Sequence, residues 1–161
     1  MAIYMKYGSI NGDVTTQGFE NYIELGAFSW GVGRGISMQS GSKQGREASL
    51  PSLSEITITK EYDVASGDLL KEALSGNVQE VDIVFTRTGT GGSGAQQFMK
   101  VSMKDVILSG LSMSAGSDGK PMESLSLNYS QISFTNNPMK DDGTAGPQSV
   151  VNFNLGTMVM S

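Results

Sequence analysis

The stretch Glu55-Ile-Thr-Ile-Thr-Lys-Glu-Tyr62, followed after a short link by Ser66-Gly-Asp-Leu-Leu-Lys-Glu-Ala-Leu-Ser75, decides the fold. Its first part alternates with period two: one face carries Ile56, Ile58, Lys60 and Tyr62, and the other carries two threonines and a glutamate. This alternation predicts a β-strand with one face in the core. The second part has helical spacing and predicts the only helix of the chain.

Three features define this helix. Ser66 is the expected N-cap, Asp68 suits the positive end of the helix dipole, and Gly76 is the expected stop. The apolar residues form one stripe, made of Leu69, Leu70, Ala73 and Leu74. The helix can therefore cover one side of a sheet.

Strand patterns fill most of the remaining sequence, over residues 2–7, 22–30, 78–88, 96–113, 125–134 and 150–160. The buried phase changes near Lys104-Asp105 and again between Tyr129 and Ile132, which predicts a bulge or bend at each point. Segment 33–54 fits neither helix nor strand and is interpreted as a long loop. We predict a mainly β fold: a closed or nearly closed antiparallel β-barrel with one flanking α-helix and a long extended loop, as a single domain over residues 1–161. Residues 150–160 are the expected closing strand.

Composition excludes several classes of function. The 161 residues include no cysteine and no histidine, so thiol nucleophiles, Ser–His–Asp triads, disulfides and the usual zinc sites are impossible. The net charge of −5, with scattered basic residues, argues against nucleic acid. No apolar run exceeds three residues, so we expect neither membrane insertion nor a signal peptide, and we expect synthesis in the cytoplasm.

The motifs that suggest chemistry each have a plainer interpretation. Gly89-Thr-Gly-Gly-Ser-Gly94 matches a dinucleotide fingerprint, but a strand follows it, so we interpret it as a hairpin loop. Ser40-Gly-Ser-Lys43 matches a serine acylase motif outside any expected helix, and Asp141-Asp142-Gly143 lacks the further acids of a calcium loop. Candidates for a catalytic acid pair are Glu24, Asp82 and Asp105, and Trp30 could stack on a sugar. We expect no enzyme and no catalytic, cofactor or metal residues.

The strand surfaces favour self-association. Charged residues make up 17% of the chain, against about 25% in a typical protein. The positions away from the core carry short polar side chains such as Thr57, Ser102 and Ser126, where a solitary barrel would use Lys and Glu. Apolar residues also occur there, at Val84 and Ile107. Such a surface is typical of a subunit covered by copies of itself.

The order of these features resembles the hemolysin-coregulated proteins of bacterial type VI secretion systems. The most specific similarity is Ser54-Glu-Ile-Thr-Ile-Thr-Lys60 before the helix, and little can be carried over after Pro138. Further similar stretches are Ile23-Glu-Leu25, Phe28-Ser-Trp30-Gly-Val32, Asp63-Val-Ala-Ser66, Lys100-Val-Ser-Met-Lys-Asp-Val-Ile-Leu-Ser109 and Glu123-Ser-Leu-Ser-Leu-Asn-Tyr129. The resemblance covers nearly the whole chain.

The resemblance implies hexameric rings that stack into a hollow tube, which is surrounded by a contractile sheath, capped by a spike and able to carry effectors in its lumen. It also implies secretion without a signal peptide and, because the sequence stops at Ser161, the plain structural form without a toxin domain. In that setting we expect Lys43, Arg46, Leu50 and Leu53 to contact neighbouring subunits.

Two other functions stay open from the residues alone. A phage tail-tube subunit would form the same rings. A small ligand-binding or carbohydrate-acting barrel would instead be a compact monomer that uses Trp30 and paired carboxylates.

Overall fold

The computed structural model describes residues 1–38, 46–140 and 142–161. The described chain is mainly antiparallel β-structure with one α-helix, as predicted. Its elements are β1 (Ala2–Tyr7), β2 (Ile23–Leu25), β3 (Ala27–Ser29), β4 (Val32–Gly33), β5 (Ile36–Met38), β6 (Arg46–Ala48), β7 (Ser52–Leu53), β8 (Ile56–Glu61), α1 (Ser66–Ser75), β9 (Gln79–Thr88), the 3₁₀ turn η1 (Thr90–Gly92), β10 (Ala95–Ser114), β11 (Met122–Asn128), β12 (Gln131–Asn136), β13 (Ser149–Asn154) and β14 (Val159–Met160).

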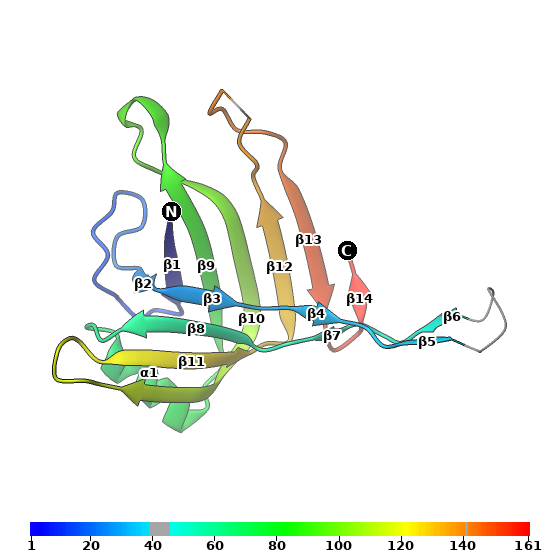
Figure 1. Ribbon diagram of the computed structural model, residues 1–161. Coiled ribbons are helices and arrows are strands. Elements are labelled where there is room, and N and C mark those ends of the chain that lie inside the picture. The colour runs from blue at the N-terminus through cyan, green and yellow to red at the C-terminus, as the bar shows by residue number, and fades with distance from the viewer. Residues whose placement is uncertain (39–45, 141) are drawn as a thin grey trace.

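The long strand β10 belongs to two layers. Its first half pairs with β9 on one side and β12 on the other, within a layer ordered β2-β1-β9-β10-β12-β13-β14. Its second half pairs with β11, and that layer continues through β8 to β3. Figure 1 shows the two sets of strands running across each other. One strand therefore supplies the corner that joins the layers.

The corner lies where the change of phase predicts a bulge. Asp105 has a φ of 54°, and the register against β9 shifts between Met103 and Val106. Because of the shift, Met103 and Val106 both point into the core although they are three residues apart. The second predicted bend separates β11 from β12 at Tyr129-Ser130. The bulge within β10 is confirmed, whereas the single strand predicted over 125–134 is divided at this bend into β11 and β12.

The core lies between the layers. It contains the inward residues of β1, β8, β9, β10 and β11 together with Leu69 of α1. A second, smaller cluster lies on the outer face of β1 and β9, where segment 8–22 covers Tyr4 and Val84 with Val14. Val84, which the alternation places on the outer face of its strand, is therefore buried by segment 8–22 of the same chain.

Helix α1 differs from the prediction in two respects. Its N-cap is Ala65, not Ser66, because the Ser66 hydroxyl contacts buried groups of the sheet instead. Only part of the expected stripe is buried: Leu69 is enclosed, but Leu70 and Leu74 are 47% and 80% exposed. Gly76 ends the helix with a φ of 67°, as predicted.

The barrel does not close. Residues 150–160 form β13 and β14 at the outer edge of the first layer, beyond β12, and in the described chain no further strand pairs with β14. The prediction of a closing strand is wrong, because local alternation contains no information about which partner a strand will find. No helix in the described residues is long and apolar enough to cross a membrane.

Candidate functional site

Segment 32–53 is named the arm, and its described parts, 32–38 and 46–53, form a two-stranded ribbon that projects from the body of the molecule (Figure 1). β4 pairs with β7, and β5 pairs with β6. The predicted long extended segment is therefore present, and its described parts pair as short strands that the sequence pattern did not indicate. Ladder hydrogen bonds join backbone groups, so a ribbon that projects from the body needs no alternation of apolar and polar residues along its length.

Tyr129 fixes the base of the arm. Its hydroxyl accepts a hydrogen bond from Trp30 Nε1 at 2.8 Å and donates one to the Ser54 carbonyl at 2.8 Å. Gly31 N–H also donates to Ser54 Oγ, and Ser54 N–H donates to the Gly31 carbonyl. Burial raises the pKa of Tyr129, so the phenol stays protonated and able to donate. The two legs of the arm are thus tied to each other and to the body.

The structure describes three of the four predicted contact residues. Lys43 lies outside the described residues. Arg46 begins β6 and pairs with Met38. Leu50 is 68% exposed, whereas Leu53 is half-buried, pairs with Val32 and packs against the core. Leu50 and Leu53 line one surface, while Arg46 belongs to the part of the ribbon beyond it.

That surface, named the apolar groove, has a volume of about 410 Å³. It lies between the base of the arm and the sheet edge formed by β12, β13 and β14. Arg34 is the one charged residue among its described walls, which are otherwise Trp30, Val32, Leu50, Pro51, Leu53, Ile132, Phe134, Val151, Phe153, Met158 and Met160. Soluble monomers rarely expose a large contiguous apolar patch, so the groove indicates an interaction site.

The sheet-edge wall of the groove was not predicted. Val151 and Met160 are 46% and 69% exposed. The adjacent pair Val150-Val151 was a usable signal, because neighbouring strand residues face opposite sides and one of the two must leave the core.

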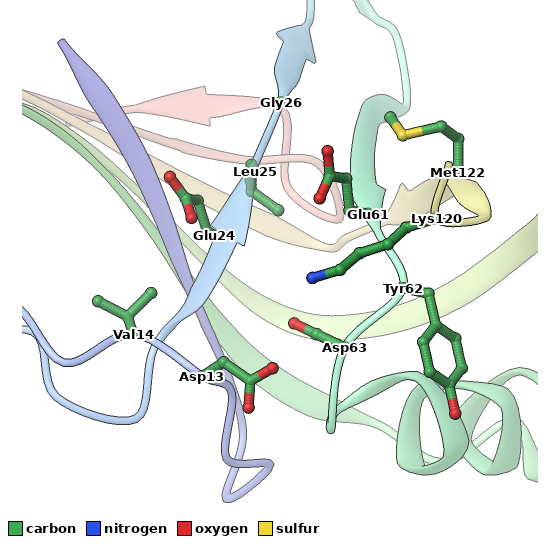
Figure 2. A pocket seen from close by; sticks show the side chains of 10 residues that line it. All are labelled: Asp13, Val14, Glu24, Leu25, Gly26, Glu61, Tyr62, Asp63, Lys120 and Met122. Atoms are coloured by element: carbon green, nitrogen blue, oxygen red, sulfur yellow. The ribbon is translucent and has the colours of Figure 1, made fainter. Parts of the chain in front are cut away.

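A second cavity, named the hollow, has a volume of about 330 Å³ and lies between β2, the end of β8 and the start of β11. Figure 2 shows Lys120 reaching in among acidic side chains. The walls are Asp13, Val14, Glu24, Leu25, Gly26, Glu61, Tyr62, Asp63, Lys120 and Met122. Four carboxylates against one amine leave three net negative charges.

Beneath the hollow, a buried ion pair joins the sheet to the helix. Lys60 Nζ lies 2.5 Å from Glu123 Oε2 and 2.9 Å from Asp63 Oδ1. Ser66 Oγ, on the first residue of α1, donates to Glu123 Oε2 at 2.8 Å. Lys60 and Glu123 are cross-strand neighbours on β8 and β11. Lys60 thus holds the inward position that the alternation predicts, but with a carboxylate partner that no local pattern identifies.

The candidates for chemistry do not come together. Glu24 lines the hollow, Asp82 pairs with Lys100 at 3.4 Å, and Asp105 accepts a hydrogen bond from Ser130 at 2.6 Å. Residues 89–94 turn β9 into β10, as the hairpin interpretation predicts. Within the described residues no group of three or more acidic side chains could hold a metal ion. Ser40-Gly-Ser-Lys43 lies outside the described residues.

Comparison with solved structures shows the fold. A type six secretion system protein matches with a TM-score of 0.91 at 23% identity, over 99% of both chains. Hcp1 from Salmonella typhimurium matches with a TM-score of 0.79 at 19% identity, over 99% of this chain and 98% of that one. A type VI secretion system effector from Yersinia pestis matches with a TM-score of 0.73 at 18% identity, over 94% and 98%.

Comparison of sequences shows the family. No curated protein matches the chain. The sequence pattern of the family described as "Type VI secretion system effector, Hcp" matches residues 4–135. That match covers the arm, α1 and most of both layers, and leaves out β13 and β14 at the edge of the first layer. The chain therefore belongs to the Hcp family of type VI secretion system proteins, and its role is that of a tube subunit.

Proposed function

We propose that the chain is one domain over residues 1–161, that six copies form a ring, and that rings stack into a hollow tube. The observation that carries this proposal is the clamped arm beside an exposed apolar groove. A ribbon tied at its base by Tyr129 is already oriented away from the body, which lowers the entropy that it loses when it binds. Burial of the apolar groove between subunits would stabilise the assembly, because it removes apolar surface from water.

Within the ring, the predicted contact residues act as follows. Leu50 inserts between subunits, Leu53 supports the arm from below, and Lys43 and Arg46 meet acidic groups of a neighbour. The exposure of Leu50 and the half-burial of Leu53 support these separate tasks.

The tube carries effectors in its lumen, and its further partners are the contractile sheath and the spike of the secretion system. The chain itself leaves the cell through that system, without a signal peptide. It acts as a structural protein and catalyses no reaction. The family description as a secretion effector supports the route, and the separation of Glu24, Asp82 and Asp105 supports the absence of catalysis.

Electron microscopy of the purified protein tests the proposal. We expect uniform six-fold rings with an open centre. The change Leu50→Glu should abolish them, whereas Leu74→Glu, which adds the same charge at a more exposed leucine on α1, should leave them intact. Monomers from the unaltered protein would contradict the proposed ring. Rings of unchanged size and stacking after deletion of residues 40–48 would contradict the contacts assigned to the arm.

A further inference from the structure

We propose that the apolar groove of a single subunit binds a free medium-chain fatty acid, with the alkyl chain in the groove and the carboxylate against Arg34. This inference goes beyond the proposed ring, because it concerns the groove while it is open. It is carried by the composition of the groove walls, by the order of polarity along them and by the charge of Arg34.

The walls of the apolar groove have the composition of a small-molecule site. Its volume of about 410 Å³ lies within the usual range for such sites, about 300–1,000 Å³. Trp30, Phe134 and Phe153 supply three aromatic rings, and the other apolar walls are aliphatic or methionine side chains. Arg34 is the one charged residue among the described walls. A ligand that fits this site is therefore mostly apolar and carries one anionic group.

Polarity changes in one direction along the arm side of the groove. Trp30, Val32 and Arg34 alternate along one leg, so their side chains share the face that lines the groove. Trp30 is half-buried and packs against the core, Val32 is 57% exposed, and Arg34 is exposed. A fatty acid has the same order of polarity, with its apolar tail at Trp30 and its carboxylate at Arg34.

The guanidinium group of Arg34 is available to an anionic ligand. Every ion pair within the described residues involves a lysine, so no acidic side chain there is paired with Arg34. A guanidinium can donate two parallel hydrogen bonds to one carboxylate. A cationic head group would instead be repelled. Charge therefore selects a fatty acid over an alkyl amine of the same length.

The distance between the two ends of the groove sets the length of the alkyl chain. Four residue steps of extended backbone, from Trp30 to Arg34, span about 13 Å. An extended alkyl chain advances about 1.3 Å per carbon, because its bonds of about 1.5 Å zigzag, so about ten carbons reach from one end to the other. Each buried methylene strengthens binding about fourfold, so octanoate should bind about fifteenfold more weakly than decanoate.

Tryptophan fluorescence tests this binding, because Trp30 is the only tryptophan of the chain. Bromodecanoic acid, below its micelle concentration, is present while the unaltered protein refolds from guanidinium at low protein concentration. The acid then reaches the groove before another subunit does. Bromine quenches tryptophan on contact, so ω-bromodecanoic acid should quench Trp30 strongly and α-bromodecanoic acid weakly. Equal quenching by the two acids, or none by either, would overturn the proposal.

Two adjacent valines give a matched pair of variants. Val151 and Val150 are 46% and 47% exposed and lie on opposite faces of β13, and Val151, unlike Val150, is a wall of the groove. Val151→Glu should weaken binding about tenfold or more, because an unpaired charge then meets the alkyl chain. Val150→Glu should leave binding unchanged. Equal affinities of the two variants would place the ligand elsewhere and overturn the site.

The role of Arg34 has its own control. Arg34→Gln should weaken binding of the acid about two- to fivefold, which is the range of an exposed ion pair. Lys71→Gln removes the same charge from the exposed face of α1 and should have no effect. An equal affinity of Arg34→Gln and the unaltered protein would contradict the contact between Arg34 and the carboxylate.

Two competing ligands test the chemical class. Decyltrimethylammonium has the same alkyl chain with a cationic head, and it should displace the bromo acid about tenfold less well than decanoate does. Equal displacement would reduce the groove to an apolar surface without selectivity and overturn the proposal. Vesicles of brominated anionic phospholipid should not quench Trp30, and quenching by vesicles alone would assign the groove to a membrane instead. None of these outcomes depends on ring formation, which electron microscopy tests separately.

Discussion

Replacing Lys60 by methionine should destabilise the fold far more than removal of any surface charge. Lys60 is fully buried, and its amino group contacts Glu123 Oε2 at 2.5 Å, Asp63 Oδ1 at 2.9 Å, Ser66 Oγ at 3.2 Å and the Glu61 carbonyl at 2.9 Å. The Glu123 side chain is only 1% exposed. Once Lys60 is removed, the Ser66 hydroxyl is the one described partner that Glu123 Oε2 keeps. Its other oxygen has no hydrogen-bond partner among the described residues.

The expected loss follows from that burial. Removing one member of a buried ion pair leaves an uncompensated charge and costs about 3–5 kcal/mol. A domain has a total free energy of unfolding of about 5–15 kcal/mol, so Lys60→Met should remove a fifth of it or more. Removing both charges in Lys60→Met/Glu123→Leu should return the stability to within about 1–2 kcal/mol of the unaltered protein.

Guanidinium unfolding followed by circular dichroism measures both losses. Protein concentration must be equal throughout, because assembly adds to apparent stability by mass action. The matched control is Lys71→Met, which removes a lysine paired with Asp68 at 3.7 Å with side chains 82% and 55% exposed, and should cost under about 1 kcal/mol. The reasoning is refuted if Lys60→Met costs no more than Lys71→Met, or if the double variant is less stable than Lys60→Met.

Two tyrosines should respond in opposite ways to loss of the hydroxyl. Tyr129→Phe should lower the free energy of unfolding by about 1–3 kcal/mol and reduce ring yield, because it breaks both hydrogen bonds to the base of the arm. Thermal unfolding and electron microscopy measure the two effects. An unchanged ring yield would show that Tyr129 does not position the arm for assembly. Tyr7→Phe should be neutral or stabilising, because the buried Tyr7 hydroxyl has no hydrogen-bond partner among the described residues. Burial, assisted by Glu72, raises the pKa of Tyr7 from 10.0 to about 12. The unfolded chain therefore loses this proton first, so stability is full below pH 10 and declines between pH 10 and 12, by at most about 3 kcal/mol. Unfolding curves across that window should show a smaller decline for Tyr7→Phe, and an equal decline would contradict the assignment.

The hydrogen bonds of Tyr129 and the buried ion pair of Lys60 with Glu123 have different roles in the proposed assembly. Lys60 and Glu123 hold α1 against the sheet beneath the hollow, so their loss affects folding first. Tyr129 lies at the other end of β8 and positions the arm, so its loss affects assembly first. Comparing ring yield with stability in the two variants therefore separates the two effects.

The sequence by itself determined the features that local backbone geometry controls. The alternation over residues 55–62 predicted β8, and Gly76 predicted the end of α1. The change of phase at Lys104-Asp105 predicted the bulge that joins the layers. Each of these depends on neighbours within a few residues, so the pattern along the chain contains the necessary information. The resemblance to the hemolysin-coregulated proteins could also be recognised from the sequence, because it rests on the same pattern of strands and helix.

Only the tertiary structure decided which segments and side chains contact each other. The arm is a ribbon because its backbone groups pair with each other, which no side-chain pattern marks. Leu70 and Leu74 stay exposed although they share the predicted stripe with Leu69, which is fully buried. The hollow gathers Asp13, Glu24, Glu61 and Asp63 from three separate segments. Such contacts depend on loop closure and packing across long sequence separations, so one strand's pattern cannot specify the surface it will share with another.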